Sequence, residues 1–92
     1  LSGNGAGTIM KITLQFYTIL KDCLPEGAAG NEAEIEIEDG ATIQNIIERQ
    51  NMPQKMINMV MVSGTYVAPS DFTSHELKNG DTLSMWPPLA GG

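Results

Sequence analysis

The sequence is poor in basic residues and in long apolar runs, and each shortage excludes a class of function. Five Lys and Arg residues stand against eleven Asp and Glu, for a formal net charge of −6. Because nucleic acids and anionic membrane surfaces are bound by clustered cations, we expect neither as a partner. No apolar stretch approaches the roughly 20 residues that a membrane helix requires. We also expect no secretory signal.

Residues that commonly build active sites and metal sites are scarce as well. Cys23 is the single cysteine, so no internal disulfide can form, and we expect a reducing, cytoplasmic location. No sequence-local group would lower its pKa, so we expect a buried or idle thiol. His75 is the single histidine and is expected to be solvated, which leaves no metal-ligand set. The glycines at positions 3, 5 and 7 lack the flanking strand and helix of a phosphate-binding loop.

Ninety-two residues suffice for one small domain. Residues 1–9 are glycine-rich and without a period, which predicts a flexible leader of native or cloning origin, with Met10 as the expected natural start. Residues 10–86 form the expected folded domain. Residues 87–92 form an expected extended tail.

Apolar and polar residues alternate over residues 10–17 and again over residues 32–38, which predicts two half-buried strands. Residues 21–31 contain proline and glycines and predict a loop between them. The second strand has a row of outward acidic residues. We interpret this row as a solvated strand face that resists aggregation, with a docking surface for a basic partner as the alternative. The row consists of Glu32, Glu34, Glu36 and Glu38.

One convincing helix follows. Thr42 is its expected N-cap, although Asn45 stands where a full capping box would have Glu or Gln. Pro53 should stop the helix near Met52. The isoleucines at helical spacing are expected to pack against apolar residues of the two strands. The expected core comprises Ile43, Ile46 and Ile47 with Ile12, Leu14, Phe16, Ile35 and Ile37.

Three further strands are expected over residues 57–63, 66–67 and 82–86. The order strand, strand, helix, strand, short strand, strand predicts an α+β fold of the ubiquitin-like β-grasp type, with a mixed sheet of about four or five strands and one main helix. The methionines around the third strand are expected to fill gaps in the core, with an adaptable apolar patch as the alternative. They are Met52, Met56, Met59 and Met61.

The C-terminus carries the most specific pattern, Trp-Pro-Pro-Leu-Ala-Gly-Gly. The prolines favour a rigid, extended path, and the terminal glycines have no side chains. Because six extended residues reach roughly 20 Å, the tail can thread its carboxylate through a narrow channel into another protein's active site. We predict the following roles: Trp86 as the anchor, Pro87, Pro88, Leu89, Ala90 and Gly91 as the threading residues, and Gly92 as the residue with the reactive carboxylate.

These features resemble the MoaD family, the small subunit of molybdopterin synthase, within the ubiquitin-like MoaD/ThiS sulfur carriers. The similarity spans about residues 10–92, and Pro-Pro-Leu-Ala-Gly-Gly after an aromatic residue is its most specific element. Residues 62–67 also resemble the family's Val-Asn-Gly-x-x-Val, with Ser63 in place of the usual Asn. Trp86 stands where the family more often has Phe, a difference that affects packing rather than chemistry.

The resemblance implies a sulfur carrier that is not an enzyme by itself and holds no permanent cofactor. In this family an E1-like adenylating enzyme (MoeB/ThiF-like) uses ATP and magnesium to adenylate the terminal carboxylate. Sulfur from a donor such as a cysteine desulfurase or rhodanese then replaces AMP, which implies a thiocarboxylate at Gly92. The carrier docks on the large, MoaE-like synthase subunit and donates sulfur to a cyclic pyranopterin precursor.

Other functions fit the same features. The thiamine-pathway carrier shares the fold and the terminal glycines, although those chains are usually shorter and tend to lack Pro-Pro. Carriers for other sulfur-containing metabolites form a second alternative. A ubiquitin-like modifier would instead join Gly92 to a lysine by an isopeptide bond. A plain β-grasp interaction module would not need its terminal glycines.

Overall fold

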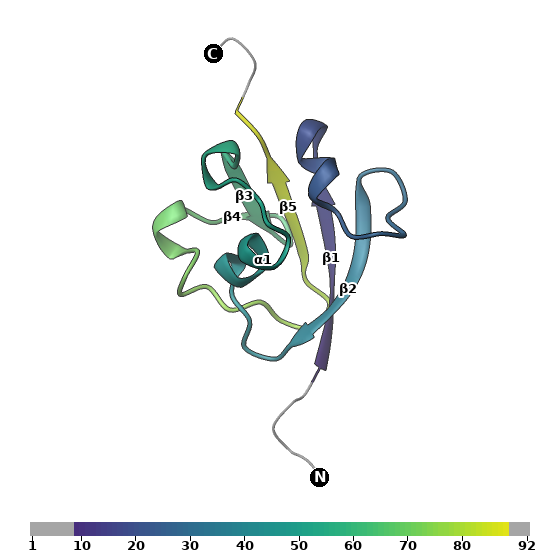
Figure 1. The fold of residues 1–92 in the computed structure, drawn as a ribbon. Coiled ribbons are helices and arrows are strands. Elements are labelled where there is room, and N and C mark those ends of the chain that lie inside the picture. Colours follow the sequence, from purple (N-terminus) through teal and green to yellow (C-terminus); the bar gives the residue numbers. More distant parts are fainter. Residues whose placement is uncertain (1–8, 89–92) are drawn as a thin grey trace.

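The computed structural model describes residues 9–88 (Figure 1). The predicted leader before Ile9 and the predicted tail beyond Pro88 lie outside the described residues. The elements, in chain order, are β1 (Ile9–Phe16), η1 (Thr18–Cys23), β2 (Glu32–Glu38), α1 (Ile43–Arg49), η2 (Gln54–Met56), β3 (Met59–Val62), β4 (Thr65–Tyr66), η3 (Pro69–Asp71) and β5 (Thr82–Trp86), where η denotes a 3-10 helix.

The five strands form one mixed sheet in the order β2-β1-β5-β3-β4, and α1 lies across one face of it (Figure 1). β1 and β5 are parallel, whereas the other neighbours are antiparallel. β5 therefore occupies the centre of the sheet. Because β1 and β5 are parallel, their C-terminal ends lie side by side at the same end of the strands. This arrangement confirms the predicted α+β, ubiquitin-like β-grasp fold with one main helix.

The core lies between the sheet and α1. Alternate residues of β1 are buried, and the three isoleucines of α1 are at most 1% exposed, as the two periodicities predict. All eight predicted core residues are buried. The structure adds further core residues from segments where the sequence predicted a loop, a turn or only a short strand. These are Leu20, Val67, Phe72 and Leu77.

The start of α1 differs from the prediction in one respect. The Thr42 side chain accepts a hydrogen bond from the Asn45 N–H at 3.2 Å, and the Asn45 side-chain oxygen accepts one from the Thr42 N–H at 2.9 Å. Asn45 therefore completes the capping box, since its short amide reaches the donor that Glu or Gln usually satisfies. The helix ends at Arg49 rather than near Met52, because the backbone at Asn51 turns left-handed (φ 54°).

Several other predicted boundaries shift. β1 begins at Ile9, which pairs with Glu38 and so belongs to the sheet and not to the leader. β3 begins at Met59 rather than at residue 57, and β4 spans Thr65–Tyr66 rather than residues 66–67. η1 begins before the predicted loop and continues into it. This 3-10 helix forms because its Leu20 side chain, 1% exposed, joins the core.

Candidate functional site

The chain leaves the sheet from the end of its central strand. Trp86 ends β5, and the half-buried Pro87 and the exposed Pro88 follow. The backbone here is hydrogen-bonded from both sides: Tyr17 N–H donates to the Met85 carbonyl at 3.1 Å, and Asn58 N–H donates to the Trp86 carbonyl at 2.8 Å. The last residues of β5 therefore give the chain a fixed backbone from which to leave the sheet. We call residues 85–88, the end of β5 and the two prolines after it, the chain exit.

An aromatic pair lies at the chain exit. The ring centroids of Tyr17 and Trp86 are 4.6 Å apart, and their planes differ by 3°, which is a stacked arrangement. The contact follows from the parallel pairing of β1 with β5, because Phe16 pairs with Met85 and the next residue of each strand then lies beside the other. Both rings are half-buried.

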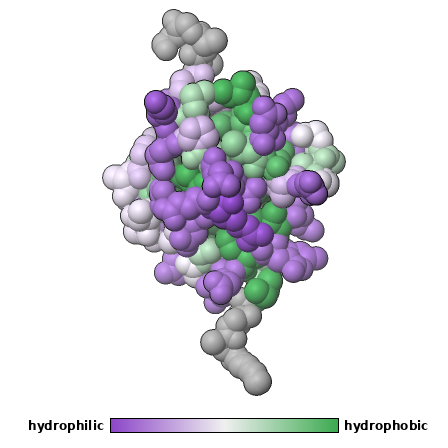
Figure 2. All heavy atoms as spheres, in the orientation of Figure 1, coloured by the Kyte–Doolittle hydropathy of each residue, from purple (hydrophilic) through white to green (hydrophobic). Residues whose placement is uncertain are grey.

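Beside this pair lies an apolar groove of about 590 Å³. Segments distant in the sequence build it: the start of η1, the end of η2 with the start of β3, and the chain exit. Ile19 is 56% exposed, so the groove has an apolar wall open to solvent. Figure 2 shows separate apolar spots within a mostly hydrophilic face, some of them at the end where the chain leaves the sheet. The groove is lined by Thr18, Ile19, Met56, Asn58, Met59, Trp86, Pro87 and Pro88.

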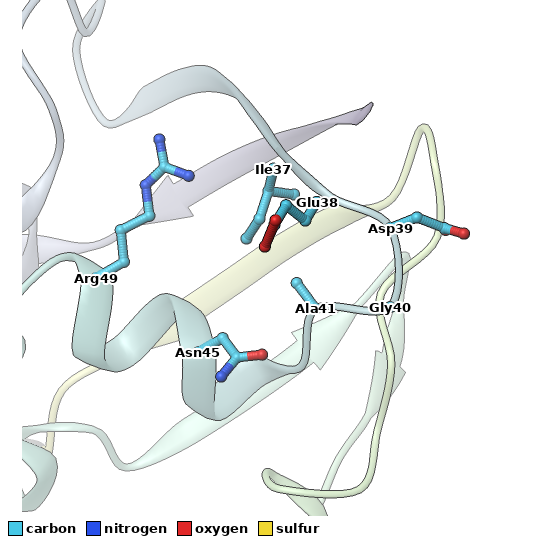
Figure 3. Close-up of a pocket in the computed structure, with 7 residues that line it drawn as sticks. All are labelled: Ile37, Glu38, Asp39, Gly40, Ala41, Asn45 and Arg49. Carbon is cyan, nitrogen blue, oxygen red and sulfur yellow. The ribbon is translucent and has the colours of Figure 1, made fainter. Parts of the chain in front are cut away.

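A second hollow, of about 520 Å³, lies where β2 leads into α1 (Figure 3). Figure 3 shows Arg49 and Asn45 projecting from α1, Glu38 lying opposite them, and Asp39 pointing away. The Arg49 guanidinium donates to the Glu36 carbonyl at 3.0 Å, so this cation already serves to join α1 to β2. The hollow mixes one cation with two acids and is separate from the chain exit, and we assign it no chemistry.

The other chemically versatile residues lie apart from one another. Cys23 is half-buried, and burial, with a smaller contribution from the charge of Asp22, raises the pKa of its thiol above the ordinary 9.0. A raised pKa reduces the thiolate fraction, which is the opposite of what a nucleophile needs. His75 is half-buried rather than fully solvated, because it lies in the turn that precedes the buried Leu77. Within residues 9–88, no three His, Cys, Asp or Glu side chains gather as metal ligands.

The acidic row and the methionines have distinct surroundings. All four glutamates of β2 are exposed, at the edge of the sheet. Met52 is buried and fills the core, whereas the other three are half-buried. Met56 packs against the core, and both Met56 and Met59 line the apolar groove, so the core interpretation is confirmed for Met52 while the adaptable patch for a partner stays a prediction. No helix in the described part of the chain has the length and apolar character needed to cross a membrane.

Of the predicted tail residues, the structure describes Trp86, Pro87 and Pro88 and places them together at the chain exit. The predictions for Leu89, Ala90, Gly91 and Gly92 lie outside the described residues. Sequence analysis missed Tyr17 and Ile19 as neighbours of the chain exit. The alternation in β1 already indicated that Tyr17 faces away from the core, but only the pairing of β1 with β5 brings it to Trp86.

Comparison with known proteins identifies one family. The model of the ThiS family matches residues 14–92 of this chain. None of the curated proteins compared with the chain matches it.

Among solved structures, the thiamine biosynthesis protein ThiS of Geobacter metallireducens matches with a TM-score of 0.61 and 14% identity, over 90% of this chain and 100% of that one. SAMP1 of Haloferax volcanii matches with a TM-score of 0.63 and 16% identity, over 89% and 99%. The complex of subunits 1 and 2 of the molybdopterin-converting factor from Helicobacter pylori contributes a chain with a TM-score of 0.57 and 16% identity, over 90% and 100%. At these identities the likeness shows the shared fold.

Proposed function

Because this chain belongs to the ThiS family of ubiquitin-like sulfur carriers, we propose that it carries sulfur as a thiocarboxylate on Gly92 and supplies it for molybdopterin synthesis. The observation that carries the proposal is the chain exit: a central strand, hydrogen-bonded on both sides, that leads directly into Pro-Pro-Leu-Ala-Gly-Gly. A fixed exit followed by a narrow sequence suits the delivery of a terminal group into another protein's active site.

The chemistry explains why the carrier needs no acid–base residues of its own. A carboxylate is a poor electrophile, so an oxygen of the Gly92 carboxylate first attacks the α-phosphorus of ATP, and pyrophosphate leaves. Hydrosulfide, released from the donor's persulfide by a thiol that is oxidised to a disulfide, then attacks the carbonyl carbon, and AMP leaves. Two easier steps replace one difficult step. The nucleotide, the magnesium ion and the proton-transfer groups belong to the E1-like adenylating enzyme.

The proposed synthase partner is a large, MoaE-like catalytic subunit. This is supported by the Helicobacter pylori complex, in which subunits 1 and 2 of the molybdopterin-converting factor are bound to each other. The net charge of −6 suits electrostatic steering toward basic partner surfaces. A single cysteine, which can form no internal disulfide, suits a reducing compartment, and we propose the cytoplasm.

Two alternatives to the molybdopterin pathway are each supported by a comparison with known proteins. The name of the matching family and the Geobacter ThiS structure favour the thiamine pathway, in which the same thiocarboxylate would have another acceptor. The likeness to SAMP1, a small archaeal modifier protein, favours attachment of Gly92 to a lysine. The Pro-Pro pair before the last four residues favours the molybdopterin pathway, because thiamine-pathway carriers tend to lack it.

Intact-mass measurement tests the carrier function. The chain is incubated with ATP, magnesium, a cognate adenylating enzyme and a sulfur donor, beside a matched chain that lacks Gly92. We expect a mass gain equal to the exchange of one oxygen for sulfur, absent from the shorter chain. No gain, with the adenylating enzyme active on another carrier, would contradict the proposal. A lysine adduct bearing the Gly-Gly remnant would favour the modifier.

A second experiment tests the pathway. The sulfur-loaded chain is mixed either with a large molybdopterin synthase subunit and its cyclic pyranopterin precursor, or with the thiazole-forming enzyme of thiamine synthesis. We expect sulfur to reach the pterin. Transfer in the thiazole reaction alone would keep the carrier function and reject the molybdopterin assignment.

A further inference from the structure

The Tyr17–Trp86 stack lies at the only covalent connection between the sheet and the tail. Trp86 precedes Pro87 directly, and proline fixes its own φ near −65°. The two prolines therefore transmit the orientation of the backbone at Trp86 to the residues beyond them. A flat ring stacked on the indole at 4.6 Å with a 3° angle opposes rotation of that side chain. Because the rotamers open to a side chain depend on the φ and ψ of its residue, an indole held in one rotamer narrows the backbone angles of Trp86 and with them the direction in which the tail leaves.

Tyr17 borders a hydrogen-bonded network that crosses three strands. Gln15 is its centre: the side-chain N–H of Gln15 donates to the Glu32 carboxylate of β2 at 2.6 Å. The side-chain oxygen of Gln15 accepts from the Ser84 hydroxyl of β5 at 3.0 Å and, more weakly, from the Tyr17 hydroxyl at 3.5 Å. Ser84 is only 8% exposed, so the network is partly shielded from water.

We infer that Tyr17 is a positioning residue: its ring, stacked on Trp86, orients the root of the tail before any partner binds. The inference rests on the proposed function, because the tail matters only if Gly92 reacts. If the first residues of the tail already point in the direction they have in the complex, they lose less conformational entropy when the adenylating enzyme takes up the tail. The affinity of the carrier for that enzyme is then higher. The bound tail is the same with or without the stack, and the chemical step should therefore not change.

Four variants separate the stack from other effects. Tyr17→Leu and the straight-chain Tyr17→Met keep apolar bulk without an aromatic ring, and either one suffices should the other not fold. Tyr17→Phe keeps the ring and removes the hydroxyl. Tyr66→Leu is the matched control, because Tyr66 is 56% exposed on β4, at the far edge of the sheet from β1.

The first measurement uses the free carrier and does not involve sulfur. Trp86 is the single tryptophan, so its indole N–H gives one NMR signal. We expect its order parameter to fall in Tyr17→Leu and Tyr17→Met and to stay unchanged in Tyr17→Phe and Tyr66→Leu. An unchanged order parameter in the Leu and Met variants would overturn the inference.

The second measurement is the KM for the carrier in thiocarboxylate formation. From the usual strength of aromatic stacking, we expect a rise of about two- to tenfold in Tyr17→Leu with kcat unchanged, and restoration by Tyr17→Phe. Equal loss in Tyr17→Phe, an equal rise in Tyr66→Leu, or an unchanged KM in Tyr17→Leu would overturn this role alone. A wild-type chain that takes up no sulfur from a competent adenylating enzyme would overturn the carrier function and this role with it.

Discussion

Adjacent residues of this chain have opposite environments, which decides how each responds to substitution. Phe16 is 0% exposed at the end of β1 and packs in the core, whereas Tyr17 is half-buried and contacts Trp86 on the other face. Cys23 lies a short distance further along the chain, half-buried at the end of η1, against the core rather than within it. We therefore expect substitution of Phe16 to change stability, substitution of Tyr17 to change the behaviour of the tail, and substitution of Cys23 to leave sulfur transfer intact.

Truncation of Phe16 should destabilise the domain. Phe16→Ala removes a fully buried ring and leaves a cavity, which costs about 3–5 kcal/mol of the free energy of unfolding. Denaturant unfolding measures this loss. Tyr66→Ala is the control, because an exposed side chain contributes within about 0.5 kcal/mol. An unchanged unfolding curve for Phe16→Ala would show that our assignment of the core is wrong.

Replacement of the thiol should leave sulfur transfer intact. Burial and Asp22 raise the pKa of Cys23, so the thiol is protonated at neutral pH, and its contribution to stability, present below pH 9.0, is lost as the pH rises through the folded pKa. We expect Cys23→Ser to load and transfer sulfur at the wild-type rate in the mass assay. A folded variant that takes up no sulfur would move the chemistry to the thiol.

Among the elements, the turn between β3 and β4 shows how one serine supports two loops. Ser63 and Gly64 both have positive φ, at 48° and 88°, as the tight turn of a two-residue hairpin requires. This explains why Asn is usual in the resembling family, since Asn tolerates that conformation well. Ser63 compensates through its hydroxyl, which donates to the Asp81 carboxylate at 2.9 Å and accepts from the Thr82 N–H at 3.2 Å. The hairpin is thereby joined to the start of β5.

A methyl group at the second turn position should weaken the domain through the backbone alone. An added Cβ at Gly64 would meet no atom within 4 Å, so Gly64→Ala introduces no clash. The positive φ nevertheless disfavours any side chain, and we expect a loss of about 1–2 kcal/mol in the free energy of unfolding. Thermal and denaturant unfolding measure it. A variant as stable as the wild type would show that the turn can change its type without cost.

At the scale of the whole molecule, the core that stabilises the domain and the proposed reactive end belong to different parts of the chain. The strand order places the acidic β2 at one edge and β5 in the centre, so the tail continues from the strand that is hydrogen-bonded on both sides. The described residues contain the whole core that we assign, and the proposed reactive end lies beyond them. Substitutions in the tail should therefore change sulfur transfer without changing unfolding.

Gly91→Val tests this separation directly. A branched side chain at the penultimate position should block entry into a narrow channel, so we expect loading and transfer to be lost. The melting curve should match that of the wild type. Tyr66→Val is the matched control, because it places the same branched side chain at an exposed position away from the tail. Normal turnover by Gly91→Val would contradict the threading of the tail.

Much of the fold could be predicted because periodicity reports burial. The alternation in β1 and β2 and the spacing of the α1 isoleucines identified the correct inward faces, and the tail motif indicated a reactive carboxylate without any structure. Local geometry decided two points that residue types did not suggest. The Asn45 side chain closes the capping box, and η1 extends into the residues expected to form a loop, with its Leu20 side chain buried in the core.

The sequence by itself indicated the core residues of β1, β2 and α1, the order of the strands and the main helix, and the family that the chain resembles. Only the tertiary structure decided which strands are neighbours. The parallel pairing of β1 with β5 brings Gln15 to Ser84, which are 69 positions apart, and Tyr17 to Trp86. Periodicity could not show these contacts, because it records the face on which a side chain lies and carries no information on the strand beside it. The apolar groove and the chain exit are products of that pairing.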